Sequence, residues 1–360
     1  MRPSPSNVDS YIEGARREAR GKLTREQLEE EAGRQAQLAA QECLMKGVTT
    51  FHDAGVSFQT TDFYRKLIDE GKLGLRLWVM LAEGNASLRK RLAEYRILGY
   101  GDRRLTVRAI KRSIDGALGP RGAWLLEPYD DLPGSTGLNT TPVEEIVETA
   151  RLAIELDFQL CVHAIGDRAN RETLDLYERT FKAHPDKKNL RWRIEHAQHL
   201  HPDDIPRCGR IGVIAAMQGV HCTSDAPFVV ARLGAMRAEE GAYAWRSLLK
   251  SGAVIVNGTD APVEDVNPIE SFAASVSRRL KDGSIFNPGQ RMSRIEALKS
   301  YTLDAAYAAF DETTRGSLSR GKLADITVLS RNILTIPEDQ ISGTEVLYTI
   351  VGGKLMYERR

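Results

Sequence analysis

Residues 158–196 read FQLCVHAIGDRANRETLDLYERTFKAHPDKKNLRWRIEH. This stretch holds two short apolar runs, residues 158–163 and 191–196, and each run ends in a histidine. The residues between them, Asn170 to Ala183, have the pattern of a helix. A strand, a helix and a second strand in this order predict a β–α–β unit with parallel strands and a right-handed crossover.

The same alternation repeats along most of the chain, with seven β/α units between residues 24 and 280. Strands are predicted at residues 48–51, 75–81, 105–111, 158–163, 191–196, 213–217 and 253–257. Helices are predicted at residues 24–46, 62–70, 87–98, 170–183 and 242–251, with others beginning near residues 141, 202, 267 and 293. A long Gly/Pro-rich loop is expected from Asp115 to Thr140. This regular α/β pattern predicts a (β/α)8, TIM-type barrel.

Four polar residues stand at the ends of predicted strands: Lys111, His163, His196 and Asp260. Their separations of 52, 33 and 64 residues correspond to one unit plus the long loop, one unit, and two units. Because the chemistry of such barrels lies at the carboxyl ends of the strands, we expect these side chains to meet there.

Imidazoles and carboxylates are ligands for zinc and similar divalent ions. A buried lysine can lose its proton and add CO₂ to become a carbamate, an anion able to bridge two metals. The four residues therefore predict a metal centre holding one or two divalent ions, with zinc as the expected metal. Asp260 would also act as the catalytic base that takes a proton from a metal-activated water, which predicts hydrolysis of an amide or related C–N bond.

Each of these residues also has an ordinary structural interpretation. A lysine at a strand end is usually a surface charge, and a single histidine there usually belongs to the core or the rim. Asp260, two residues before Pro262, has the sequence of a turn former. The metal interpretation is favoured because all four recur in order and in step with whole β/α units.

Composition narrows the class of protein further. The chain has 360 residues, 42% of them hydrophobic, and a net charge of +1. It has no basic block, no long apolar run and no apolar N-terminal stretch, so we expect no nucleic-acid partner, no membrane partner and no secretory signal. The four cysteines are widely scattered, which fits a reducing compartment, and the protein is predicted to be soluble and cytoplasmic.

The chain is predicted to have three parts. Residues 1–21 form a polar tail, residues 22–310 the barrel, and residues 311–360 a small β domain. Within the last part, strands are expected at residues 325–329, 346–351 and 354–357, and Gly352–Gly353 would turn the final hairpin.

Six further segments of the chain are distinctive: GVTTFHDAG, IKRSIDGALG, VHAIGDRA, IEHAQ, GTDAPVEDVNP and RGSLSRGKLADITVL. These motifs resemble those of the amidohydrolase superfamily, and in particular its YtcJ-like, amidohydrolase-3 branch. The resemblance extends from about residue 38 to residue 357 and implies a barrel with a β-sandwich built from both chain ends.

The resemblance also implies roles for single residues. Lys111 would be the carboxylated bridging ligand, His163 and His196 would be metal ligands, and Asp260 would be the last ligand and general base. Arg121, in the loop after Lys111, would border a small-molecule substrate, and Gln218 and His221 would lie beside it. Members of the family hydrolyse amides, formamides or cyclic C–N substrates.

The sequence departs from the family pattern at one place. The family has a His-x-His pair at the end of its first strand, and no such pair occurs upstream of Lys111. Seven units therefore indicate a barrel that lacks strand one and has two open edges. Residues 1–20, a second copy in a homo-oligomer, or a missing, separately encoded N-terminal segment would cover them. His52 is a candidate substitute ligand because its side chain has the parity to point inward.

Three hypotheses follow from this departure. The chain is part of an amidohydrolase that is active when complete, or it is active alone with one metal. Alternatively, it is a catalytically impaired fragment or pseudoenzyme that acts as a binding or interaction protein.

Overall fold

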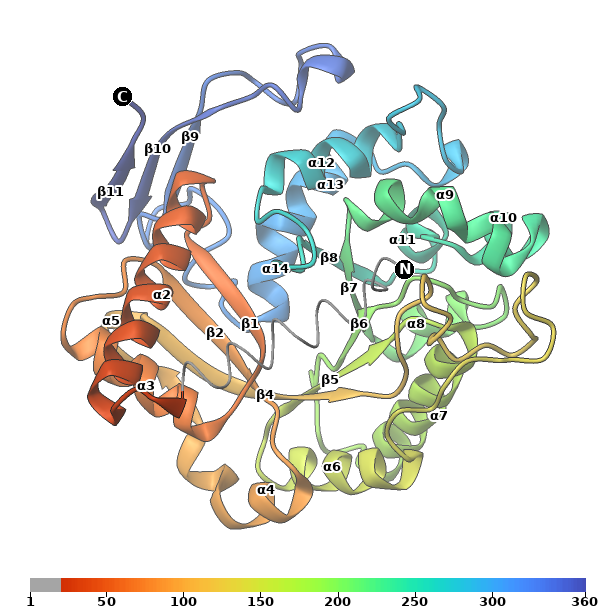
Figure 1. The fold of residues 1–360 in the computed structure, drawn as a ribbon, viewed down its shortest axis with the longest axis horizontal. Coiled ribbons are helices and arrows are strands. Elements are labelled where there is room, and N and C mark those ends of the chain that lie inside the picture. The colour runs from red at the N-terminus through yellow and green to blue at the C-terminus, as the bar shows by residue number, and fades with distance from the viewer. Residues whose placement is uncertain (1–20) are drawn as a thin grey trace.

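A computed structural model describes residues 21–360, so nearly all of the predicted tail lies outside the described residues. A parallel sheet with the strand order β1-β2-β4-β5-β6-β7-β8 forms the centre of the structure (Figure 1). Its strands are β1 Thr50–Val56, β2 Arg76–Leu81, β4 Leu105–Ser113, β5 Gln159–Ala164, β6 Arg193–His196, β7 Ile214–Gln218 and β8 Val254–Gly258. The sheet curls into an open barrel of seven parallel strands, and no described ladder joins β1 to β8. The predicted barrel architecture is confirmed, with seven parallel strands in the described residues.

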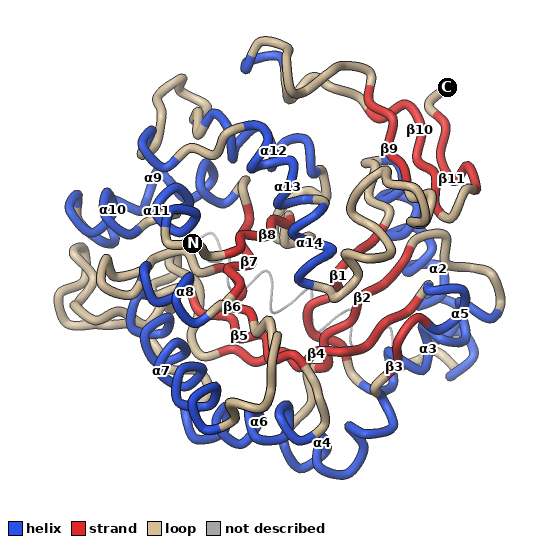
Figure 2. The backbone as a smooth tube through the Cα atoms, turned by 180° about the vertical axis from the view of Figure 1, so that it is seen from behind, coloured by secondary structure: helices blue, strands red, loops and turns tan. Residues whose placement is uncertain are grey.

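Helices cover the outer face of this sheet (Figures 1 and 2). They are α2 Arg25–Met45, α3 Phe58–Asp69, α4 Asn85–Arg91, α5 Tyr100–Arg103, α6 Val143–Glu155, α7 Asp167–Ala183, α8 Ile205–Ile211, α9 His221–Leu233, α10 Ala235–Gly241, α11 Trp245–Lys250, α12 Pro268–Ser277 and α13 Arg294–Tyr301. The last helix, α14 Leu303–Ala308, ends against the barrel interior. The capping box predicted at Thr24 and Gln27 is present at the start of α2. The segment of α9 and α10 had no predicted structure.

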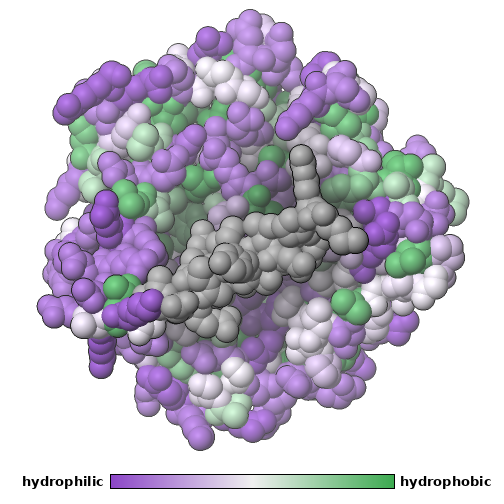
Figure 3. Space-filling model, in the orientation of Figure 1, coloured by the Kyte–Doolittle hydropathy of each residue, from purple (hydrophilic) through white to green (hydrophobic). Residues whose placement is uncertain are grey.

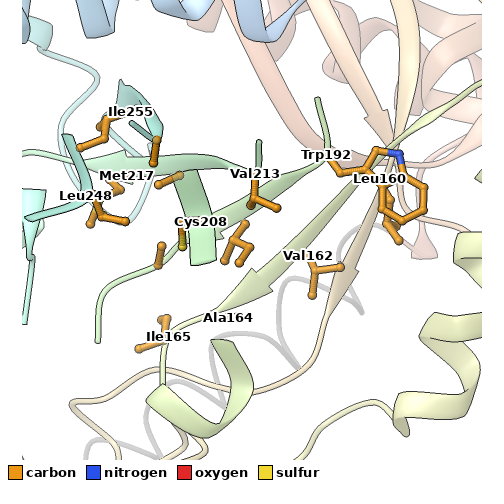
Figure 4. Close-up of a cluster of buried hydrophobic side chains, with 14 of the residues drawn as sticks. Leu160, Val162, Ala164, Ile165, Trp192, Cys208, Val213, Met217, Leu248 and Ile255 are labelled. Carbon is orange, nitrogen blue, oxygen red and sulfur yellow. The ribbon is translucent and has the colours of Figure 1, made fainter. Parts of the chain in front are cut away.

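Side chains alternate along each strand between the helices and the barrel interior, so both faces are buried. On β5, Leu160, Val162 and Ala164 pack with residues of the neighbouring strands and helices, as Figure 4 shows. The intervening Cys161 packs inside the barrel with Trp78, Met80, Ala109 and Ala309. Ala308 and Ala309, at the end of α14, therefore help to fill the interior beneath the strand ends.

Strand register brings the carboxyl ends of the strands level. Ser113 of β4 is paired with His163 of β5, and Ala164 pairs with His196 of β6. Side chains that follow different strands in the sequence are thus delivered to one edge of the sheet, where the predicted site lies.

Two predicted elements were wrong in extent or type. β1 was expected to end at Phe51, but it continues to Val56 because the segment from His52 onward pairs with β2. The helix expected over residues 87–98 ends at Arg91, and a 3₁₀ turn, Leu92–Tyr95, follows. A short strand, β3 Ile97–Gly99, then pairs antiparallel with β4. The apolar residues in this segment recur at helical spacing, but they belong to three elements: a helix, a 3₁₀ turn and a strand.

The predicted C-terminal β domain is a three-stranded antiparallel sheet in the order β11-β10-β9. Its strands are β9 Ile326–Leu329, β10 Val346–Val351 and β11 Lys354–Glu358, and the Gly352–Gly353 turn is confirmed. This sheet lies beside α2 in both views of the backbone.

Hydrophilic side chains dominate the periphery of the face seen in Figure 3. Among the described residues, no helix combines the length and the apolar character that crossing a bilayer requires.

Candidate metal centre

Three histidine rings converge at the carboxyl ends of β5, β6 and β7. The rings of His163 and His196 meet edge to face with their centroids 4.5 Å apart. The ring of His221, at the start of α9, stacks on His196 at 6.1 Å. Asp260, just beyond β8, has its Oδ2 atom 3.8 Å from Nε2 of His221. Potential ligand atoms of His196, His221 and Asp260 all lie within 4.8 Å of one another.

The backbone at the end of β6 turns the side chain of His196 into this group. Simple alternation would place His196 on the same face as Ile194, which packs in the outer core. His196 and Ala197 instead adopt left-handed conformations, with φ of 76° and 45°, and Asp260 has φ of 60°. Such conformations are unfavourable for residues other than glycine, and they cluster at functional sites.

Gln218, at the end of β7, fixes the orientation of His196. Its Oε1 atom accepts a hydrogen bond from Nδ1 of His196 at 2.8 Å. The Nε2 atom of Gln218 donates to the carbonyl of Ala216 at 3.3 Å, so the amide cannot exchange its two ends. The lone pair of His196 therefore lies on Nε2, as a metal ligand requires.

Burial changes the protonation of the site residues. It lowers the pKa of Lys111, although the nearby carboxylates of Glu195 and Asp260 act in the opposite direction. It also lowers the pKa of His196 well below its usual range, and His163 and Lys111 add to this effect. Burial raises the pKa of Asp260, against the influence of His221, Lys111 and His163. In each case burial shifts the pKa toward the uncharged form of the side chain.

Asp115 was predicted only as the first residue of the long loop, but it anchors that loop to the site. Its carboxylate accepts hydrogen bonds from the backbone N–H groups of Trp124, Ile165 and Gly166 at 2.8 to 3.0 Å. Its Oδ1 also lies 3.4 Å from Nε2 of His163, without the geometry of a hydrogen bond. A Cβ atom at Gly166 would lie 2.0 Å from the Trp124 carbonyl oxygen, so only glycine allows this approach.

The barrel floor beneath the site contains an unexpected buried ion pair, Arg193–Glu195, with Nε and Oε1 separated by 2.7 Å. His52 points inward, as its parity predicted. Its Nδ1 faces Nη1 of Arg193 at 3.3 Å and its ring lies tilted against that of Trp78, while burial lowers its pKa to about 3. His52 thus has a structural partner on the floor.

The predicted substrate-binding residues occupy different surroundings. Gln218 and His221 are buried within the cluster. The guanidinium of Arg121 is half-exposed and is engaged by Asp131, to which its Nε and Nη2 donate at 3.0 and 2.9 Å. A role of Arg121 in substrate binding remains a prediction.

The residues present fit a divalent cation. The Nε2 atom of His163 is buried and has no hydrogen-bond partner, and Nε2 of His196 is free to act as a ligand. Asp260 supplies a carboxylate, and Lys111 has the environment in which an amine can lose its proton. Nitrogen and oxygen donors in this combination suit zinc and related ions.

Comparisons with known proteins agree with this chemistry. The Amidohydro_3 model, described as the amidohydrolase family, matches residues 3–357. The putative amidohydrolase YtcJ of Bacillus subtilis (strain 168) is 31% identical over 333 residues, which cover 89% of this chain and 60% of that protein. The N-substituted formamide deformylase of Arthrobacter pascens is 26% identical over 321 residues, or 88% of this chain and 58% of that protein.

A solved structure is also similar in fold. The crystal structure of an uncharacterized metal-dependent hydrolase from Pyrococcus furiosus superimposes with a TM-score of 0.72 at 30% identity. The match covers 87% of this chain and 62% of that one. The chain thus spans less than two thirds of the length of each of these relatives.

Proposed function

The chain belongs to the amidohydrolase family, and on that premise we propose that it carries out, or forms part of an enzyme that carries out, the metal-dependent hydrolysis of a C–N bond. The substrate class is a small amide, formamide or cyclic amide. The similarity to a deformylase of N-substituted formamides supports this class.

Lys111, His163, His196 and Asp260 would hold one or two divalent ions, with zinc as the proposed metal. When bound, such an ion lowers the pKa of water and polarises a carbonyl group. Lys111 would contribute as a carbamate, formed when its neutral amine adds CO₂ and releases a proton. Gln218 would accept a hydrogen bond from Nδ1–H of His196 and so leave the lone pair of Nε2 available for the metal.

Asp260 would transfer the proton in the reaction. The carboxylate takes a proton from the attacking water and passes it to the nitrogen of the leaving amine, so that one amide and one water give a carboxylic acid and an amine. Burial raises the pKa of Asp260, which favours uptake of that proton by the carboxylate.

The observation that carries the proposal is the convergence of His163, His196 and Asp260 at the same end of the sheet. The backbone is left-handed at two of the three positions. An ordinary rim histidine or turn aspartate would not explain why separate strands deliver these groups to one place.

The test measures zinc binding and hydrolysis in parallel. Zinc per chain is measured by mass spectrometry after gel filtration, and amine release is followed with N-alkyl formamides and simple amides. We expect His163→Asn and His196→Asn each to weaken zinc binding at least about tenfold, whereas His184→Asn, at the end of α7, binds as the parent does.

Asp260→Asn is expected to reduce hydrolysis at least about 100-fold. Zinc binding that survives unchanged in both histidine variants would overturn the proposed site. Zinc binding without hydrolysis of any amide would instead favour a binding protein.

A further inference from the structure

A buried polar network adjoins His221 and is separate from the proposed metal ligands. It consists of Gln198, which follows β6, Asp225 on α9, and Tyr243, which precedes α11. We infer that this network fixes His221 as a hydrogen-bond donor to the substrate and thereby excludes it from the metal ligands. The inference rests on the proposed function, because it assigns a role within the same site.

The amide nitrogen of Gln198 lies at the centre of the network. Its Nε2 is 2.9 Å from the hydroxyl of Tyr243, 3.2 Å from Nδ1 of His221 and 3.3 Å from Oδ2 of Asp225. Gln198, Tyr243 and His221 are only 3%, 1% and 6% exposed, so solvent does not compete for these contacts. The backbone N–H of Tyr243 also donates to the carbonyl of Gln198 at 2.7 Å.

These contacts determine which end of the Gln198 amide faces His221. The hydroxyl of Tyr243 donates its only proton to Oδ2 of Asp225 at 2.5 Å. The Tyr243 oxygen and the Asp225 carboxylate can then only accept, so the Gln198 atom that faces them must be the NH₂ group. Nδ1 of His221 faces the same NH₂ group, whose two protons are shared among three neighbours, and a ring nitrogen facing this group can only accept. A ring nitrogen that accepts carries no proton, so the proton of His221 must be on Nε2.

His196 has the opposite tautomer, because Gln218 presents its oxygen to Nδ1 of that ring. Two stacked rings, 6.1 Å apart, thus differ in function. His196 offers a lone pair from Nε2, and His221 offers an N–H from the equivalent atom. The proximity of His196, His221 and Asp260 alone would suggest three ligands for one ion, but the hydrogen bonds assign two ligands and one donor.

The N–H of His221 has no hydrogen-bond partner among the described residues, and Nε2 is buried 3.8 Å from Oδ2 of Asp260. Because this N–H lies beside the proposed general base, it is placed to donate a hydrogen bond to the carbonyl oxygen of the substrate. When water adds to the carbonyl carbon, the C–O π electrons move onto that oxygen, and the His221 N–H stabilises the developing charge without giving up its proton. His221 is then a catalytic residue, and Gln198, Asp225 and Tyr243 are positioning residues.

Close packing fixes the position of His221 as well. A Cβ atom at Gly219 would lie 2.2 Å from the carbonyl oxygen of Ser271, so the turn between β7 and α9 lies directly against α12. The N–H of Val220 donates to the Ser271 hydroxyl at 3.1 Å. The ring therefore enters the site from a rigid turn, as a preorganised donor should.

Nitrogen-15 NMR of the zinc-loaded, histidine-labelled chain tests the tautomers directly, with His221→Asn and His196→Asn to assign the signals. We expect the proton on Nε2 of His221 and on Nδ1 of His196. Gln198→Glu replaces the NH₂ group with an acceptor and should move the His221 proton to Nδ1. A His221 that already carries its proton on Nδ1, or whose Nε2 signal shows zinc ligation, would overturn the inference.

Kinetics give a second readout that distinguishes a donor from a structural residue. Gln198→Glu should lower kcat about 100-fold with zinc content unchanged, as loss of one oriented donor does. Tyr243→Phe keeps the contact between Gln198 and Asp225 and should lower kcat about tenfold or less, which keeps the test valid if Gln198→Glu does not fold. A chain that binds no zinc and hydrolyses nothing contradicts the proposed function, whereas the opposite tautomer of His221 in an active, zinc-loaded chain contradicts only this inference.

Discussion

The guanidinium of Arg76 on β2 forms a bidentate ion pair with the carboxylate of Asp325, with nitrogen–oxygen distances of 2.7 and 3.0 Å. The two side chains are only 1% and 5% exposed. Arg76 also donates to the carbonyls of Asp102 and Arg103, and Asp325 accepts from the N–H of Gly352. This pair therefore connects the barrel to the hairpin of the C-terminal sheet.

Removing one partner of this pair should destabilise the chain strongly. Asp325→Asn leaves the buried guanidinium uncompensated, and such a loss costs about 3–5 kcal/mol. The free energy of unfolding from urea titration checks this value. Asp131→Asn, which breaks the more exposed ion pairs of Asp131 with Arg121 and Arg232, is the control and should lower stability much less. Equal effects of the two substitutions would show that the Arg76–Asp325 pair does not hold the barrel and the C-terminal sheet together.

Asp115 should determine the order of the loop at residues 115–140. Asp115→Ala leaves three backbone N–H groups without an acceptor, and each of the two buried ones, at Ile165 and Gly166, costs about 1–3 kcal/mol. We expect faster hydrogen–deuterium exchange in that loop and little change in α3, on the other side of the barrel. Asp115→Asn keeps one acceptor oxygen and should give a smaller increase. Unchanged exchange in the alanine variant would contradict the anchoring role.

The sequence predicts the barrel and the positions of Lys111 and His163 because both depend on local patterns. A strand end is visible as the end of an apolar run, and alternation along the strand then aims the side chain inward. His196 follows the first rule but not the second, because a left-handed backbone turns it into the site. The tautomer of His221 could not be predicted, since Asp225 and Tyr243 reach Gln198 only after distant segments have come together.

Metal loading should depend on bicarbonate through Lys111. Burial lowers the pKa of this lysine, which makes its neutral amine available for carbamate formation. Zinc bound per chain is therefore expected to rise with added bicarbonate, and Lys111→Met should abolish this rise without unfolding the chain. Lys72→Met, on the connection between α3 and β2, provides the control. If zinc binding by the parent chain does not change with bicarbonate, Lys111 does not act as a carbamate ligand.

Buried histidines should make the metal-free chain less stable in mild acid. Burial lowers the pKa of His199 to about 3 and that of His52 to about 3, from an unfolded value near 6.5. Between these values the unfolded chain binds protons that the folded chain does not. Their stability contribution is thus complete above pH 6.5 and is lost progressively as the pH falls toward 3. Each residue should cost about 1 kcal/mol between pH 6 and pH 5.

His199→Phe isolates one of these contributions, because both ring nitrogens of His199 lack a hydrogen-bond partner and phenylalanine removes only the titration. Unfolding free energies at pH 6 and pH 5 should differ by about 1 kcal/mol less in this variant than in the parent. Trp192→Phe removes buried surface but no titrating group, so it should lower stability equally at both pH values. If His199→Phe leaves the pH dependence unchanged, His199 is protonated in the folded chain, and an acidic or water partner must reach its ring.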